Sequence, residues 1–191
     1  GKFVEPLLQA GKRVVAFDAP AHGDSPGKKT NPLEYAKAIL EVGQELGNLD
    51  GIIAHSMGGG ASLIALSQGL QAKRIVLLAS AADWEYQMRF FAKYLGMPEK
   101  AASRLVRVLE EQVQADVKQL NSANVSKQLT QSALLFHDPN DPRVPYQDSV
   151  DISKQMQQAQ LVTVQGLGHA GVLEDKDVIE KSVSFLSERV V

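Results

Sequence analysis

The sequence contains no cysteine, no excess of basic residues and no long hydrophobic run, and each absence excludes a class of protein. Without cysteine the chain can form no disulfide, no thiolate metal site and no cysteine nucleophile. Its 20 basic and 22 acidic side chains give a net charge of -2, so no positive surface is available to neutralise nucleic-acid phosphates. No apolar stretch approaches the roughly 18 residues of a transmembrane helix. We therefore expect a cytoplasmic protein with no membrane span and no nucleic-acid partner.

The 191 residues are 44% hydrophobic, which suits one domain with a substantial core. Five short runs rich in β-branched and aliphatic residues recur along the chain. Their nearly continuous apolar centres are typical of strands that are covered on both faces, as in a parallel sheet. The predicted strands are residues 13–18, 51–55, 74–79, 132–137 and 160–165.

Helical patterns separate these strands. Asn31 precedes a proline and is followed three residues later by Glu34, a combination typical of a helix start. Further helices are predicted over residues 58–69 and from Asp177 onward. The alternation predicts an α/β fold with a mostly parallel sheet, helices on both faces and functional loops beyond the carboxyl ends of the strands.

Residues 83–130 contain no strand pattern and predict two or three helices. We expect a core of residues 1–82 and 131–191 that this helical lid interrupts. Five of the chain's aromatic residues fall within residues 84–94. Two compatible interpretations are that the insert packs on the sheet and that its aromatic side chains line a substrate pocket. The candidate pocket residues of the insert are Trp84, Tyr86, Phe90 and Phe91.

Ser56 lies at a predicted junction between a strand and a helix, within the sequence AHSMGG at residues 54–59. A serine on such a tight turn projects its hydroxyl above the sheet, and the N–H groups at the helix start can stabilise an oxyanion. Ala54 stands where the G-x-S-x-G pattern has its first glycine. From these residues alone, the alternative is a serine that only caps the helix.

An acid and a base follow Ser56 in the chain. A serine nucleophile needs a base to take its proton, and the base needs an acid to fix its tautomer. Asp141 lies in a proline-rich loop after the strand at 132–137, and His169 lies in a glycine-rich loop after the strand at 160–165. Because all three residues follow strand ends, we expect their side chains to meet at one edge of the sheet.

The other three histidines, His22, His55 and His137, also lie at or just after predicted strand ends. No two histidines have the spacing of metal ligands, so we predict no metal site. We expect His22 to order its loop at the edge of the site, and His55 and His137 to brace neighbouring loops. His22 and His55 are further candidates for the substrate pocket. No cofactor is predicted, because a reaction that uses a serine nucleophile, a base and an acid needs only side chains and water.

Four motifs in the expected order resemble the α/β-hydrolase superfamily across residues 11–190. The sequence DAPAHGDS at residues 18–25 is similar to the family's D-x-P-G-H-G-x-S loop, with Ala21 in place of a glycine. The nucleophile turn reads HSMGG, the acid loop reads D-x-x-V-P, and a late Gly-His pair ends at His169. The resemblance implies that the helical insert occupies the position of the family's lid.

The resemblance also assigns a role to each site residue. Ser56 is the nucleophile, His169 the general base and Asp141 the orienting acid. The backbone N–H of Met57 forms half of the oxyanion hole. Asp138 is the back-up acid if the register of the acid loop differs.

The beginning of the chain departs from this family. Members usually have three earlier strands, and the last of them ends in a His-Gly loop that supplies the second oxyanion donor. The sequence has no such segment, and Gly1–Ala10 resembles the end of the helix that follows that loop. Two expectations stay open: the chain is a fragment of a longer hydrolase, or the first two predicted strands pair directly and leave the oxyanion hole incomplete.

The expected reaction is hydrolysis of a small to medium carboxylic ester through an acyl-enzyme, with the ester as a small-molecule partner. A thioester or carbon–carbon bond hydrolase on the same scaffold is one alternative. A non-catalytic ligand-binding protein is another, and the missing oxyanion segment and Ala54 favour it. The sequence carries no signal for an oligomeric state.

Overall fold

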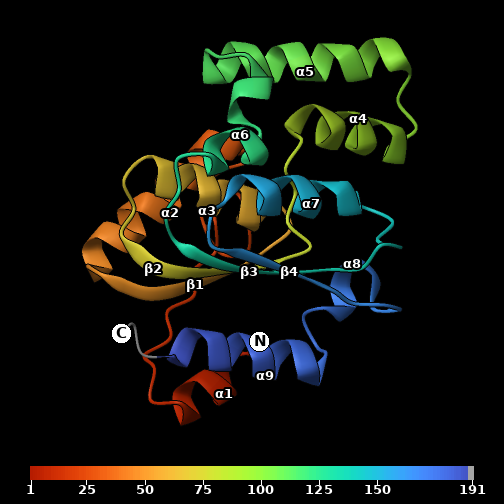
Figure 1. Ribbon diagram of the computed structural model, residues 1–191. Coiled ribbons are helices and arrows are strands. Elements are labelled where there is room, and N and C mark those ends of the chain that lie inside the picture. Colours follow the sequence, from red (N-terminus) through yellow and green to blue (C-terminus); the bar gives the residue numbers. More distant parts are fainter. Residues whose placement is uncertain (189–191) are drawn as a thin grey trace.

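The computed structural model describes residues 1–188, and its centre is a parallel sheet of four strands (Figure 1). Each strand pairs with the next one along the chain, so all four carboxyl ends lie at one edge of the sheet. Four of the five predicted strands and the α/β class are thereby confirmed. The strands are β1 (Leu49–His55), β2 (Ala72–Leu78), β3 (Ser132–His137) and β4 (Ala159–Thr163).

Helices cover both faces of the sheet, as the sequence predicts (Figure 1). Buried side chains of β2 and β3 point alternately into two apolar clusters, one on each face. This two-sided burial explains why the strand sequences are almost continuously apolar. One face carries α2 (Pro32–Leu46), α3 (Met57–Ser67) and α7 (Tyr146–Gln155), and the other carries α1 (Val4–Gln9) and α9 (Lys176–Ser187).

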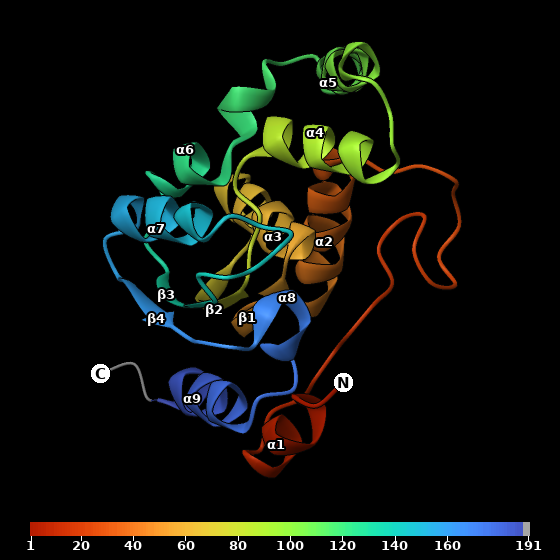
Figure 2. The ribbon, with the colours of Figure 1, turned by 90° about the vertical axis from the view of Figure 1, so that its right-hand side faces the viewer.

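The predicted strand at residues 13–18 is wrong. This part of the chain is an irregular segment between α1 and α2 (Figure 2). A groove of about 500 Å³ separates it from β1, with Val15 and Phe17 on one wall and Ile52 and Ile53 on the other. A strand needs a neighbour about 4.8 Å away to pair its backbone groups. Within residues 1–188, the edge of β1 that faces this groove has no such neighbour, so direct pairing of the first two predicted strands is also wrong.

The insert at 83–130 is helical, as predicted, and packs on the layer of α2, α3 and α7, on the side of that layer away from the sheet (Figures 1 and 2). Its last helix contacts both α3 and α7. Within residues 1–188, no helix has the length and apolar character needed to cross a membrane. The insert comprises α4 (Trp84–Tyr94), α5 (Glu99–Val113), the 3-10 helix η1 (Val117–Leu120) and α6 (Ser122–Ser126).

Asp148, near the start of α7, ties the beginning of the insert to the core. Its side chain is buried, and its carboxylate accepts hydrogen bonds from the backbone N–H of Ala82 at 2.7 Å and of Asp83 at 3.4 Å. Burial raises the pKa of Asp148 to about 6, and the nearby charge of Asp83 contributes to the increase. Ionisation of Asp148 therefore costs free energy in the folded protein.

We expect Asp148→Asn to reduce the pH dependence of the free energy of unfolding. The pKa of Asp148 in the folded protein, about 6, exceeds the ordinary value of 3.8. The stability that the protonated carboxyl of Asp148 gives the folded state is therefore fully present below about pH 4 and is lost as the pH rises through about 6. The variant should match the wild type at about pH 4 and be about 3 kcal/mol more stable at about pH 8. Urea unfolding measures both values, with Asp151→Asn in the same helix as the control. A stability difference that does not change with pH would contradict this expectation.

Candidate active site

Ser56 connects β1 to α3 in an unusual backbone conformation, with φ 54° and ψ -125°. The end of β2 holds this turn in place. The N–H of Ser56 donates to the carbonyl of Leu78 at 3.0 Å, and its carbonyl accepts from the N–H of Ala81 at 3.1 Å. The Ser56 side chain makes no hydrogen bond that caps α3, so the alternative of a purely capping serine is wrong.

Two glycines allow the first turn of α3 to approach the end of β2. A Cβ atom on Gly59 would overlap Oγ of Ser80, and a Cβ atom on Gly60 would lie 2.6 Å from the carbonyl oxygen of Ala81. Both approaches are too close for a real side chain. The glycines therefore fix the start of α3, and with it Ser56, close to the sheet.

We expect Gly60→Ala to lower the free energy of unfolding by about 3 kcal/mol, because the new methyl group meets backbone that cannot move freely. The carbonyl of Ala81 is also held by the hydroxyl of Ser122 at 2.9 Å. Gly58→Ala in the same helix is the control, since its Cβ would lie 3.1 Å from the end of the Tyr35 side chain. The control should change stability by at most about 1 kcal/mol. Equal urea-unfolding curves for the two variants would contradict the close packing.

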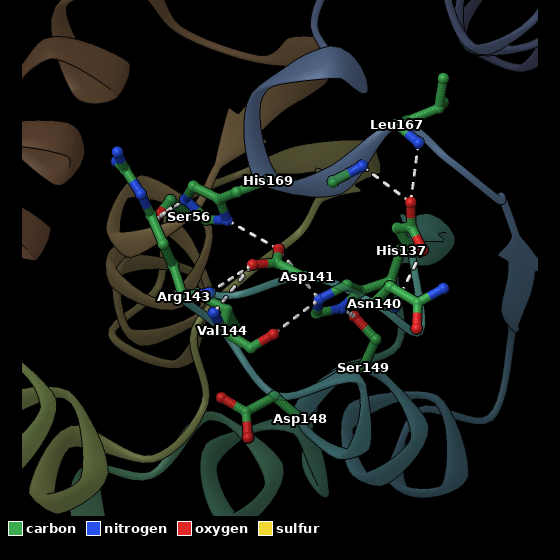
Figure 3. Close-up of polar contacts among 12 residues, drawn as sticks. Ser56, His137, Asn140, Asp141, Arg143, Val144, Asp148, Ser149, Leu167 and His169 are labelled. Atoms are coloured by element: carbon green, nitrogen blue, oxygen red, sulfur yellow. Dashed lines mark hydrogen bonds and ion pairs between the residues drawn. The ribbon is translucent and has the colours of Figure 1, made fainter.

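The structure brings Ser56, Asp141 and His169 together at the carboxyl edge of the sheet (Figure 3). Nδ1 of His169 lies 2.7 Å from Oδ2 of Asp141, and Nε2 of His169 lies 3.0 Å from Oγ of Ser56. A carboxylate only accepts hydrogen bonds, so Nδ1 carries the proton, and Nε2 of the neutral ring accepts from the Ser56 hydroxyl. The arrangement has the geometry of a nucleophile, a base and an orienting acid.

The surroundings of Asp141 keep its carboxylate ionised. The side chain has no exposed surface, and its Oδ1 accepts from the N–H of Arg143 at 2.7 Å and of Val144 at 3.0 Å. Burial alone would raise the pKa of Asp141. Hydrogen bonds from His137, His169 and the two backbone N–H groups outweigh burial and hold this pKa well below its ordinary value. Asp141 can therefore fix the proton of His169 on Nδ1.

Asp138, the expected back-up acid, binds backbone instead of His169. It accepts hydrogen bonds from the N–H groups of Leu167 and Gly168, both at 2.7 Å, and of Asn140 at 2.9 Å. These bonds, with that of Asn140 the largest contribution, lower the pKa of Asp138. Asp138 thus ties the loop that carries His169 to the acid loop. No local sequence pattern signals this contact, because its partners lie about 30 residues further along.

His55 braces the loop of His169, as the sequence predicts. Its Nε2 lies 2.8 Å from the carbonyl oxygen of His169, which can only accept, so His55 is the donor. Burial lowers the pKa of His55 and favours the neutral ring. His22 is exposed, and its Nδ1 lies 3.0 Å from the carbonyl of Pro20, so it orders its own loop. Within residues 1–188, no group of three histidine, aspartate or glutamate side chains is placed to hold a metal ion.

The four aromatic residues of the insert that were candidates for the pocket divide into three groups. Trp84 is 1% exposed and donates from its indole N–H to the carbonyl of Leu120 at 2.9 Å. Its predicted place in the pocket is wrong, because this side chain belongs to the core. Phe91 is about half exposed. Tyr86 and Phe90 stack with ring centroids 6.2 Å apart, and Tyr86 borders a pocket of about 220 Å³ at the base of the insert.

Tyr35, on α2, is a residue near the site that the sequence analysis did not single out. It lines the 500 Å³ groove together with His55 and Gly58. Burial raises the pKa of Tyr35, so its hydroxyl stays protonated at neutral pH. The groove therefore reaches the start of α3, where the backbone N–H of Met57 belongs to the first, unpaired turn of the helix.

Two family models match parts of the chain. A family model described as the alpha/beta hydrolase fold matches residues 2–97, which is half of the chain. The chain belongs to the α/β-hydrolase family. A second family model, described as TAP-like protein, matches residues 108–188. No curated protein has a matching sequence.

Several solved hydrolases have the same fold. A monoacylglycerol lipase from Paleococcus ferrophilus superposes with a TM-score of 0.75 at 22% identity, covering 98% of this chain and 88% of the lipase. A meta-cleavage product hydrolase from Pseudomonas fluorescens gives 0.68 at 18% identity, with coverage of 96% and 83%. An esterase from Exiguobacterium antarcticum gives 0.65 at 17% identity, with coverage of 90% and 80%. At these identities the likeness concerns the fold.

Proposed function

We propose that this α/β hydrolase cleaves carboxylic esters of small to medium size through an acyl-enzyme on Ser56. The observation that carries the proposal is the pair of hydrogen bonds on His169, 3.0 Å to Oγ of Ser56 and 2.7 Å to Oδ2 of Asp141. A neutral imidazole held in this way can accept a proton from the serine hydroxyl.

In the first half of the reaction, Oγ of Ser56 attacks the acyl carbon while Nε2 of His169 takes the hydroxyl proton. The backbone N–H of Met57 and the start of α3 stabilise the negative charge that develops on the carbonyl oxygen. The bond to the alcohol oxygen then breaks, and His169 gives its proton to the leaving alcohol. Asp141 keeps its charge throughout and stabilises the imidazolium.

In the second half, a water molecule attacks the acyl carbon while His169 takes a proton from it. The bond from the acyl carbon to Oγ of Ser56 breaks, and the proton returns from His169 to the serine. The carboxylic acid leaves, and the protein is restored. Each step uses groups of this chain and water.

The substrate pocket includes the stacked pair Tyr86 and Phe90 on α4 in this proposal, with α4 and α5 acting as a lid. An apolar, aromatic wall suits the acyl chain or alcohol of an ester better than it suits a charged polymer. The same nucleophile and base could also cleave a thioester or a carbon–carbon bond. One of the structural neighbours is a meta-cleavage product hydrolase, and this likeness supports the second candidate, a hydrolase of thioesters or carbon–carbon bonds.

A substrate panel tests the proposal. It contains the p-nitrophenyl esters of acetate, butyrate, hexanoate and octanoate, an acyl thioester and a β-diketone, each at several concentrations. We expect saturable ester hydrolysis, with kcat/KM at least tenfold higher for the best ester than for the thioester or the diketone.

A higher kcat/KM for the diketone or the thioester would overturn the ester assignment in favour of the second candidate. If no substrate turns over, the affinity of the wild type and of Ser56→Ala for an ester tests whether the protein is a non-catalytic binding protein. Equal affinity of both proteins for an ester would then favour a binding protein on a hydrolase scaffold.

A further inference from the structure

A second histidine contacts the acid of the site on the side away from His169. His137 ends β3, and its side chain is completely buried. Nε2 of His137 lies 3.1 Å from the carbonyl oxygen of Val144 and 3.4 Å from Oδ2 of Asp141. The oxygen that accepts from His169 at 2.7 Å therefore also faces His137 (Figure 3).

The hydrogen-bond partners of His137 determine its tautomer. A carbonyl and a carboxylate only accept, so Nε2 of His137 carries a proton. Nδ1 lies 2.7 Å from Oγ of Ser149, a residue of α7 with no exposed surface. In the neutral ring, Nδ1 accepts from the Ser149 hydroxyl. The Tyr146 ring packs edge-on against His137 with ring centroids 5.7 Å apart.

These contacts form a continuous series from α7 to the nucleophile, through Ser149, His137, Asp141, His169 and Ser56. We propose that His137, held by Ser149, is a positioning residue that fixes the side-chain orientation of Asp141 and thereby the proton on His169. This inference rests on the proposed hydrolase function, because it concerns how the same acid is held.

The physical effect follows from the two oxygens of Asp141. Oδ1 is held by two backbone N–H groups, so the side chain can tilt about that anchor, together with the His169 ring bonded to Oδ2, unless Oδ2 has a second donor. The N–H of His137, shared between Oδ2 and the Val144 carbonyl, restricts this tilt and occupies space that water would otherwise enter. Misplacement of a reacting group by about 1 Å can cost about 10²-fold in rate, so even a small tilt matters.

Two substitutions at His137 distinguish the contribution of its N–H donor from that of the volume of its ring. His137→Leu fills a similar volume but has no donor, and we expect kcat to fall by about 10²-fold with little change in KM. His137→Gln carries an amide N–H that can reach the position of Nε2, and we expect it to restore most of the lost kcat. In the leucine variant, the acid limb of the kcat/KM profile should move to higher pH. The Asp141 carboxylate has one hydrogen-bond donor fewer in this variant, so it stabilises the protonated form of His169 more strongly.

Ser149→Ala keeps the proposal testable if His137→Leu does not fold. The loss of one buried hydrogen bond to His137 should lower kcat by about tenfold. Ser182→Ala is the matched control, because Ser182 is equally buried and donates to the carbonyl of Val178 at 2.6 Å within α9, away from the site. It should leave kcat unchanged.

An NMR measurement without substrate distinguishes this proposal from the proposed function. The low-field proton of the hydrogen bond between Asp141 and His169 should shift and broaden in Ser149→Ala and His137→Leu, and remain as in the wild type in Ser182→Ala. A wild-type protein without ester turnover but with these NMR changes would overturn only the ester assignment. Folded His137 and Ser149 variants with a wild-type proton resonance, kcat and pH profile would overturn the positioning role.

Discussion

Ser56→Ala is expected to lower kcat for ester hydrolysis by about 10⁶-fold, because loss of a serine nucleophile disables the whole catalytic unit. The fold should be preserved. Among the described residues, the Ser56 hydroxyl hydrogen-bonds to His169 alone, and the backbone of the turn is held by β2 through groups that the substitution does not change. The kcat measured with the best p-nitrophenyl ester gives the loss.

Two further variants make this result specific. Ser67→Ala, at the end of the same helix, removes a hydroxyl that bonds the Ile64 carbonyl at 2.7 Å and should keep the wild-type kcat. Ser56→Gly should be as inactive as Ser56→Ala but about 1 kcal/mol more stable, since glycine adopts φ 54° with less strain. A Ser56→Ala enzyme within about tenfold of the wild type would contradict the role of this serine.

Asp141→Asn is expected to lower kcat by about 10⁴-fold while the protein stays folded. The two backbone N–H groups of Arg143 and Val144 require an acceptor at Oδ1, so the amide oxygen takes that position. The amide NH₂ then faces Nδ1 of His169 and forces the ring proton onto Nε2. A ring in this tautomer presents a donor to Ser56 and cannot take its proton.

The control for this variant is Asp175→Asn, which changes the same groups at the start of α9. Asp175 accepts from the N–H of Val178 at 3.0 Å, and the asparagine oxygen can replace that acceptor. The control should retain the wild-type kcat. An Asp141→Asn enzyme with kcat within about tenfold of the wild type would show that the orientation of His169 does not depend on this carboxylate.

The parts of the fold that were predictable from sequence depend on local physics. Asn31 accepts from the N–H of Glu34 at 2.9 Å at the start of α2, as the capping pattern indicates. The strands β2 and β3 have apolar centres because helices cover both of their faces. The order of Ser56, Asp141 and His169 was informative because parallel strands bring their carboxyl ends to one edge.

The parts that were not predictable depend on contacts between distant residues. The run at 13–18 has a strand-like sequence but pairs with no strand in the part of the chain that the structure describes, and a sequence pattern cannot show whether a neighbour exists. Trp84 belongs to the core because its indole reaches Leu120, 36 residues away. The link from Ser149 to His137 depends on how α7 packs on β3, which strand and helix patterns leave undetermined.

Labelling with a fluorophosphonate probe is the most direct test that Ser56 is an activated nucleophile. The probe reacts with a serine whose proton is taken by a neighbouring base, and mass spectrometry of the digested protein identifies the modified residue. We expect one label per chain, on the peptide that contains Ser56, and none in Ser56→Ala. Labelling should slow markedly in Asp141→Asn. A folded wild-type protein that takes up no label, or takes it up at another serine, would contradict the assignment.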